Sequence, residues 1–145
     1  MTSLTWRHAS QTDIRLLAAL NRQLVEDEGH RNYLSVAELA DRMRAFLATD
    51  YRAALFERDG RLVAYALWAE RYDGLYLRQF FVVREARRGG IGRQAMAILR
   101  SEVWPQDARL YLEVLTSNTR GLAFWRSLGF ADYALTLEML PPSAA

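Results

Sequence analysis

A run of arginine and glycine is the stretch where residue type and spacing point most directly to chemistry. Gly89, Gly90 and Gly92 follow a basic turn and precede apolar residues that recur at helical spacing. Glycine lets the backbone approach a ligand closely, and the first turn of a helix offers unpaired N–H groups and a partial positive charge. Four arginines surround the turn: Arg84, Arg87, Arg88 and Arg93. The turn therefore predicts a diphosphate site.

The elements on either side of this turn fix where such a site would lie. An apolar strand is predicted over 75–83, and a helix runs from the glycines to about Trp104, where Pro105 stops it. A further buried strand follows at 110–114. A strand, helix, strand unit is parallel and right-handed, and its ligands sit at the carboxyl end of the first strand. The turn lacks the Lys-Ser or Lys-Thr of a P-loop and the glycine spacing of a dinucleotide site.

The remaining hydrophobic pattern completes the element order β-α-α-β-β-β-α-β-α-β. The earlier strands form an antiparallel meander with a tight hairpin at Asp59-Gly60, so the sheet is mixed. The strands are predicted at about 4–7, 52–56, 62–69, 75–83, 110–114 and 133–140, and the helices at about 10–26, 36–47, 91–104 and 119–128.

Composition excludes several classes of function. The chain has 145 residues, which fits one domain over 1–145. Its 19 basic and 17 acidic residues give a net charge of +2, too small to favour nucleic acid binding. It has no cysteine, and His8 and His30 are far apart, so neither a thiol nucleophile nor a metal site is expected. No signal or membrane-spanning segment is evident, and we expect a cytoplasmic protein with no membrane partner.

Two motifs together resemble the GNAT acetyltransferase superfamily. Residues 87–92 fit its Arg/Gln-x-x-Gly-x-Gly pyrophosphate loop, and Asn118 is followed by an aromatic helix and Gly129-Phe130. With the element order, the resemblance covers essentially the whole chain. It implies an α/β (α+β) GNAT fold, with a mixed, mostly antiparallel sheet of about six strands and four helices, and acetyl-CoA as co-substrate.

The resemblance also implies which residues hold the cofactor. Backbone groups of Phe80, Phe81 and Val82 would bind the pantetheine like an added strand. The Asn118 side chain would bind the pantetheine or adenosine arm, although it also fits the N-cap of the last helix. The pyrophosphate would be held by the loop and the start of its helix: Arg87, Arg88, Gly89, Gly90, Ile91, Gly92 and Arg93.

The chain departs from the family pattern at two places. Many members carry a tyrosine acid where this chain has Trp125, whose indole can only donate a hydrogen bond, so Trp125 is assigned to core packing or to a wall of the cofactor site. Relatives that act on polyamines have two carboxylates where this chain has Arg78-Gln79. The usual base is therefore missing.

Without cysteine, direct attack of the amine on the thioester in a ternary complex is the expected route. Several polar residues are candidates for catalysis, and each also has a structural explanation. Glu28, beside His30, could be a general base or a solvated loop residue. Glu113 lies in an apolar strand, so it is either paired on the sheet or functional; Gln79 can orient an acceptor but cannot take a proton. Tyr76 and Tyr133 could be acids or strand packing.

The sequence thus predicts an N-acetyltransferase that moves an acetyl group from acetyl-CoA to a primary amine of a small molecule. The absent carboxylates keep open a non-catalytic acyl-CoA-binding module, and the undefined loops keep open a peptide or protein N-acetyltransferase. The edges of the last strand suggest a homodimer.

Overall fold

A five-stranded sheet forms the centre of the molecule, and the computed structural model describes residues 3–143 around it. The strands are β1 Thr5–His8, β2 Tyr51–Arg58, β3 Arg61–Arg71, β4 Gly74–Val82 and β5 Leu110–Tyr111. They lie side by side in sequence order. β1 to β4 are antiparallel neighbours, whereas β5 is parallel to β4, as expected for a strand that follows a crossover helix.

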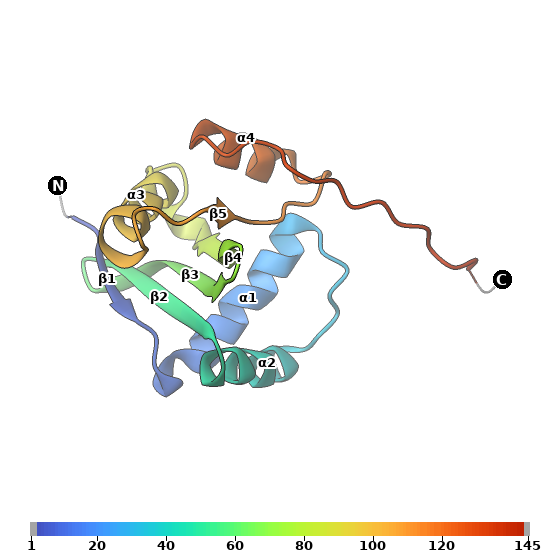
Figure 1. Ribbon diagram of the computed structural model, residues 1–145. Helices are drawn as coiled ribbons and strands as arrows, with labels where there is room; N and C mark the ends of the chain where they lie inside the picture. Colours follow the sequence, from blue (N-terminus) through green and yellow to red (C-terminus); the bar gives the residue numbers. More distant parts are fainter. Residues whose placement is uncertain (1–2, 144–145) are drawn as a thin grey trace.

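Within residues 3–143, four α-helices cover the two faces of this sheet (Figure 1). They are α1 Ile14–Glu28, α2 Val36–Ala48, α3 Ile91–Ile98 and α4 Thr119–Ser127. α1 and α2 pack on one face, in a cluster that includes Leu17, Met43 and Phe81. α3 packs on the other face with Trp68, while α4 adds only half-buried side chains there. No helix in this range is long and apolar enough to cross a membrane.

Local signals in the sequence correctly predict one hairpin turn and one helix start. Asp59 and Gly60 have φ angles of 54° and 73°, the left-handed pair that a two-residue hairpin needs. The capping box at the start of α2 also forms. Ser35 Oγ accepts from the Glu38 N–H at 3.1 Å, and Glu38 Oε1 accepts from the Ser35 N–H at 3.0 Å.

A β-bulge in β4 re-aims the side chains next to the glycine turn. Leu67 pairs with Gln79 but the following residue, Trp68, pairs with Leu77, so Arg78 is left as the extra residue. As a result Leu77 packs on the α3 face, whereas Phe81 packs on the α1 face despite the even spacing between them. Bulges of this kind turn side chains toward functional sites. Sequence periodicity, which assumes a regular strand, cannot reveal this switch.

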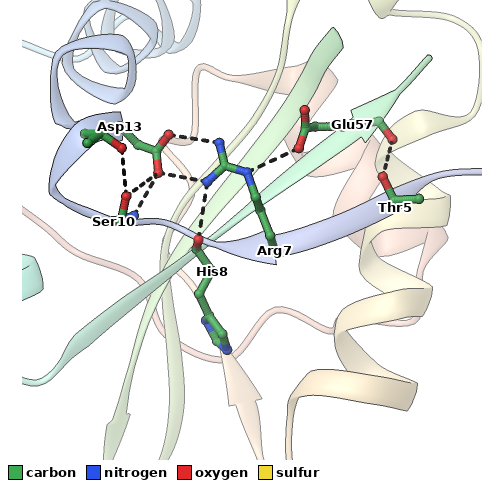
Figure 2. Close-up of polar contacts among 7 residues, drawn as sticks. Thr5, Arg7, His8, Ser10, Asp13 and Glu57 are labelled. Carbon is green, nitrogen blue, oxygen red and sulfur yellow. Dashed lines mark hydrogen bonds and ion pairs between the residues drawn. The ribbon is translucent and has the colours of Figure 1, made fainter. Parts of the chain in front are cut away.

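An ion-pair cluster ties β1 to the start of α1 (Figure 2). The Arg7 guanidinium donates to both carboxylate oxygens of Asp13 at 2.9 Å and to Glu57 on β2 at 3.2 Å. The Ser10 N–H also donates to Asp13, at 2.8 Å. The hydrogen bonds from Arg7, and then that from Ser10, hold the pKa of Asp13 below its usual value.

One predicted strand is absent, and two other predicted elements end earlier than expected. The sixth strand at 133–140 is absent: residues 130–143 contain no strand or helix, so the sheet has five strands rather than six. β5 is two residues long instead of spanning 110–114. The helix after the glycines is α-helical only to Ile98, and Leu99–Val103 continues as a π-helical turn. Alternating apolar residues show that a strand is possible, but not that a partner strand is within reach.

Candidate functional site

The glycine turn presents unpaired backbone donors at the start of α3. Gly90 is the N-cap residue with φ of 76°, and the first helical bond runs from the Gln94 N–H to the Gly90 carbonyl at 3.0 Å. The N–H groups of Ile91, Gly92 and Arg93 therefore precede the first donor that has an intrahelical partner. A Cβ at Gly89 or Gly90 would meet nothing closer than 3.8 Å, so this side of the turn is open. The arrangement suits a phosphate group.

The arginines around the turn divide into two groups. Arg84 and Arg87 each lie 2.7 Å from an Asp27 carboxylate oxygen at the end of α1, and Arg87 also donates to the Val82 carbonyl at 3.0 Å. These hydrogen bonds, that from Arg84 first, lower the pKa of Asp27. Arg84 and Arg87 thus join α1 to the turn.

The other two arginines face α4 and solvent. Arg93 donates to Ser127 Oγ on α4 at 3.0 Å. Arg88 is exposed, and among residues 3–143 its side chain has no hydrogen bond or ion pair; its φ is 70°, unusual for a residue with a Cβ. Among residues 3–143, neither Arg88 nor Arg93 is paired with a carboxylate, and of the two only Arg88 has a side chain without a hydrogen bond.

Gly92 has a packing role that its place in the motif does not show. A Cβ at this position would lie 3.1 Å from the ring of Phe124 in α4 and 3.6 Å from Val82. The absence of a side chain lets α4 pack against the first turn of α3. The N–H of Gly92 remains available to a ligand, so the two roles are compatible.

β4 and β5 diverge next to this turn. They pair only at Leu75 with Leu110 and at Tyr76 with Tyr111, whereas β4 continues to Val82. Phe80, Phe81 and Val82 therefore have no strand on their β5 side among the described residues. An extended, amide-bearing ligand can add to such an edge as a further strand.

α4 closes the far side of this divergence through aromatic contacts. The Trp125 ring lies 5.5 Å from Phe80, 4.8 Å from Phe124 and 5.5 Å from Phe130. These contacts fit core packing, one of the two alternatives that the sequence left for Trp125. Asn118 caps α4, because its Oδ1 accepts from the Gly121 N–H at 3.0 Å. Its Nδ2 donor is not used by this cap.

Glu28 and His30 form a polar pair at the end of α1. The His30 Nε2 lies 3.0 Å from a carboxylate oxygen of Glu28, and both residues keep part of their surface exposed. Burial raises the pKa of Glu28, and the charge and hydrogen bond of His30 only partly oppose this. A carboxylate with a raised pKa is suited to general-base chemistry near neutral pH. Glu26 and Asp27, just before Glu28 in the chain, are paired with Arg84.

A largely buried network connects the middle of α1 with α2, β3 and β4. The Tyr65 hydroxyl donates to Gln79 Oε1 at 2.9 Å, Gln79 Nε2 donates to Asn21 Oδ1 at 3.3 Å, and Arg42 donates to the same oxygen at 3.1 Å. Burial, and then the charge of Glu28, raise the pKa of Tyr65. Gln79 is held from both sides, by the Tyr65 hydroxyl and by Asn21.

Asn21 and Tyr65 are site residues that sequence reasoning missed. Asn21 occupies a buried position on α1 between Leu17 and Leu24, where the apolar stripe predicts another hydrophobic residue. A polar residue inside a helical stripe, three and four positions from its apolar neighbours, is the signal that could have identified it. Tyr65 had no comparable signal, because tyrosine is common in buried strands.

The remaining catalytic candidates lie elsewhere. Tyr76 donates to Glu113 at 2.8 Å beside the β4–β5 junction. Burial, and then Glu113, raise the pKa of Tyr76, so its hydroxyl holds its proton firmly. Tyr133 is exposed beyond α4, over the Arg109 guanidinium, and is not brought to the turn. Among residues 3–143, no three His, Cys, Asp or Glu side chains are grouped so as to hold a metal.

The sequence model of the protein family described as acetyltransferase (GNAT) matches residues 15–130. This range is most of the chain and includes the whole glycine turn. The chain belongs to the acetyltransferase (GNAT) family. It is accordingly an acyltransferase.

Solved structures share the GNAT fold at low sequence identity. A possible acetyltransferase from Clostridium difficile 630 is 18% identical, with a TM-score of 0.77 over 97% of this chain and 99% of that chain. Aminoglycoside N-acetyltransferase AAC(6')-Iy in complex with CoA is 15% identical, with a TM-score of 0.74 over 99% of this chain and 97% of that chain. A predicted acetyltransferase with acetyl-CoA, from Clostridium acetobutylicum, is 20% identical, with a TM-score of 0.72 over 94% of this chain and 96% of that chain. The comparison with curated proteins finds no match.

Proposed function

We propose that this GNAT enzyme transfers the acetyl group of acetyl-CoA to a primary amine of a small molecule, by direct attack within a ternary complex. The observation that carries the proposal is the divergence of β4 and β5 beside the open glycine turn. The edge of Phe80 to Val82 fits the amides of pantetheine, and the start of α3 fits its pyrophosphate. The bound CoA and acetyl-CoA of two structural neighbours support this assignment.

Within this proposal, Arg88 and the N–H groups of Ile91, Gly92 and Arg93 hold the pyrophosphate. Arg87 contributes its backbone, because its side chain is bonded to Asp27 and Val82. The Nδ2 of Asn118, which the cap of α4 leaves unused, would donate to the pantetheine or adenosine arm.

For the chemistry, the amine nitrogen attacks the thioester carbonyl carbon and the C–S bond breaks. An amide of the Phe80–Val82 segment donates to the carbonyl oxygen as negative charge develops on it. Glu28 takes the proton that the amine loses, directly or through His30, and coenzyme A leaves as the thiolate. Gln79, fixed by Tyr65 and Asn21, orients the acceptor.

The acceptor class is proposed as a small cationic amine. Two aminoglycoside acetyltransferases among the structural neighbours support an amine acceptor, and Glu28 supplies a negative charge near the thioester. A cytoplasmic location and a homodimer through the C-terminal segment complete the proposal.

Release of coenzyme A thiol from acetyl-CoA, measured with a panel of aminoglycosides, diamines and peptides, tests the proposal. We expect turnover with at least one small amine and none with the peptides. Binding of acetyl-CoA without turnover on any amine would support instead a non-catalytic acyl-CoA-binding module, which the aromatic packing of Trp125 in place of an acid favours. Turnover on peptides alone would move the acceptor class to polypeptides.

A further inference from the structure

An arginine cluster (Arg42, Arg71 and Arg78) surrounds two aromatic rings on the α2 side of the sheet. The centroids of the Phe46 and Tyr51 rings lie 4.6 Å apart. The Arg78 guanidinium lies over both rings, at 4.8 and 5.8 Å from their centroids. Arg42 lies 5.4 Å from the Phe46 centroid, and Arg71 lies 5.2 Å from that of Tyr51. Three guanidinium groups therefore share one aromatic platform.

The arginine cluster holds more positive charge than the described residues neutralise. Arg71 is paired with the carboxylate of Asp50. Among the described residues, Arg42 and Arg78 form no ion pair, and the only hydrogen bond of the Arg78 side chain goes to the Tyr51 hydroxyl, at 3.2 Å. Like charges held close together repel one another, and an anion beside them relieves the repulsion. The cluster therefore has room for an anion as a partner.

Arg42 shows this excess of charge most clearly. Its Nε is buried and has no hydrogen-bond partner among the described residues. The one hydrogen bond of its side chain there runs from Nη2 to Asn21 Oδ1, at 3.1 Å. Burial, and then the neighbouring charge of Arg78, lower the pKa of Arg42. A half-buried guanidinium without a carboxylate is costly, and an anion that contacts both arginines would offset that cost.

The arginine cluster adjoins the residue proposed to orient the acceptor. Arg78 is the extra residue of the β4 bulge and directly precedes Gln79. The bulge leaves Arg78 exposed while Gln79 is buried. Arg42 and Gln79 donate to the same oxygen of Asn21, at 3.1 and 3.3 Å. The unneutralised charge thus lies one shared hydrogen-bond acceptor away from Gln79.

Glu28, the proposed base, supplies the opposite charge to the same region. It follows Asn21 on α1 by about two helical turns, so the two side chains lie on one face of the helix. Burial raises the pKa of Tyr65 most; the charge of Glu28 adds to this effect and that of Arg42 opposes it. The proposed acceptor region is therefore flanked by a carboxylate at the end of α1 and by arginines on α2 and β4.

We propose that the acceptor amine also carries an acidic group, a carboxylate or a phosphate, which Arg42 and Arg78 bind while the amine faces Glu28. The inference rests on the proposed function and narrows its acceptor to a short ω-amino acid or its phosphate counterpart. The ammonium group keeps the cationic character proposed above. Guanidinium groups bind carboxylate and phosphate through the same N–H donors. A diamine would bring a second positive charge to the arginines and is acetylated less well.

Matched pairs of substrates measure this selectivity. Glycine, β-alanine and γ-aminobutyrate are each compared with their own amide, and O-phosphoethanolamine with ethanolamine, as kcat/KM at saturating acetyl-CoA. We expect the acid-bearing member of at least one pair to be preferred by about tenfold or more, because the neutral member loses charge-assisted hydrogen bonds. The amino acid pairs report a carboxylate, and the last pair reports a phosphate. No preference for the acid-bearing member in any pair would overturn the inference.

Variants of the arginine cluster test whether it causes the preference. Arg78→Gln removes an exposed charge and should reduce the preference by about tenfold, whereas Arg78→Lys should keep part of it. The matched control is Arg44→Gln, because Arg44 is exposed on α2 and paired with Asp41; its preference should equal that of the parent. Each ratio compares two substrates on one protein, so a general loss of activity cancels. A preference that survives in both Arg78→Gln and Arg42→Gln would contradict the inference.

Calorimetry separates a failure of this inference from a failure of the proposed function. Each acid-bearing amine is titrated into the protein in the presence of coenzyme A, which has no acetyl group to transfer. Binding that Arg78→Gln weakens by about tenfold, and Arg44→Gln does not, supports the inference even where no amine is acetylated; the transfer reaction alone would then be refuted. Acetylation of neutral amines without binding of any acid-bearing amine would refute the inference and leave the proposed function standing.

Discussion

Glu28 is the residue on which the proposed chemistry depends most directly. Its carboxylate is partly buried, which raises its pKa, and it lies 3.0 Å from His30. Its charge, after the larger effect of burial, raises the pKa of Tyr65, and the Tyr65 hydroxyl donates to Gln79 at 2.9 Å. The proposed base, its partner His30 and the proposed orienting amide of Gln79 thus come from α1, the loop after it and β4, in a chain that lacks the two carboxylates of relatives that act on polyamines.

Replacing Glu28 with glutamine should lower kcat/KM for the amine by about 10²–10⁴, because the general base is lost while the shape is kept. Steady-state assays with varied amine and saturating acetyl-CoA measure this. Glu26→Gln is the matched control, since Glu26 is exposed and paired with arginines. Equal rates for Glu28→Gln and the control would remove Glu28 from the mechanism.

His30 provides a pH test of the same pair. The charge and hydrogen bond of His30 lower the pKa of Glu28 from the level that burial alone would set. A base works only when deprotonated, so activity falls as the pH drops through the pKa of Glu28. His30→Gln should raise that pKa and move the acidic limb of the kcat/KM profile to higher pH. A limb that stays in place, or moves to lower pH, would contradict the coupling.

At the scale of elements, the junction between α3 and α4 depends on Gly92. A Cβ there would lie 3.1 Å from the Phe124 ring. We expect Gly92→Ala to destabilise the protein by about 1 kcal/mol. The Phe124 ring is held by Phe80 and Trp125, so the cost of overpacking, about 1–3 kcal/mol, exceeds the helix propensity that alanine adds, up to about 1 kcal/mol. Urea unfolding measures the change. Gly89→Ala is the control, because a Cβ at Gly89 meets nothing closer than 3.8 Å; equal stability of the two variants would refute the packing role.

The attachment of β1 to α1 should depend on pH. The pKa of Asp13 is lowered in the folded state by Arg7, so this pair stabilises the fold above the unfolded pKa of about 4 and the effect is lost as pH falls through the folded pKa. Asp13→Asn should cost about 1–2 kcal/mol at pH 7, less than a fully buried pair because Arg7 is half exposed. Unfolding curves should converge at low pH. A constant difference would contradict the linkage.

The elements that the sequence predicts correctly are those with strong local signals. Asp59-Gly60, the Ser35–Glu38 capping box and the glycine turn each depend on residues close together in the chain. The bulge at Arg78 and the buried Asn21 depend on neighbours far away in sequence, so periodicity could not show them. Residues 133–140 have the pattern of a strand but pair with no strand among residues 3–143.

At the scale of the whole molecule, the fold brings segments that are far apart in the sequence together beside the glycine turn. β4 leads into this turn, and the aromatic residues of α4 pack against Phe80 on β4. The end of α1, carrying Glu28, is joined to the same turn through Asp27 and Arg84. The cofactor motif could be predicted from the sequence. The contact between α1 and the turn could not, because it depends on ion pairs between residues about sixty positions apart.

Calorimetric titration with acetyl-CoA tests the central claim, that the glycine turn binds the diphosphate. Gly89→Glu places a carboxylate at the open start of α3 without backbone strain, since this glycine does not have a left-handed φ. Ala97→Glu adds the same charge farther along α3, on its exposed side. We expect the parent and Ala97→Glu to bind alike and Gly89→Glu to bind at least about tenfold more weakly. Equal affinity of the two variants, with both folded, would contradict the account.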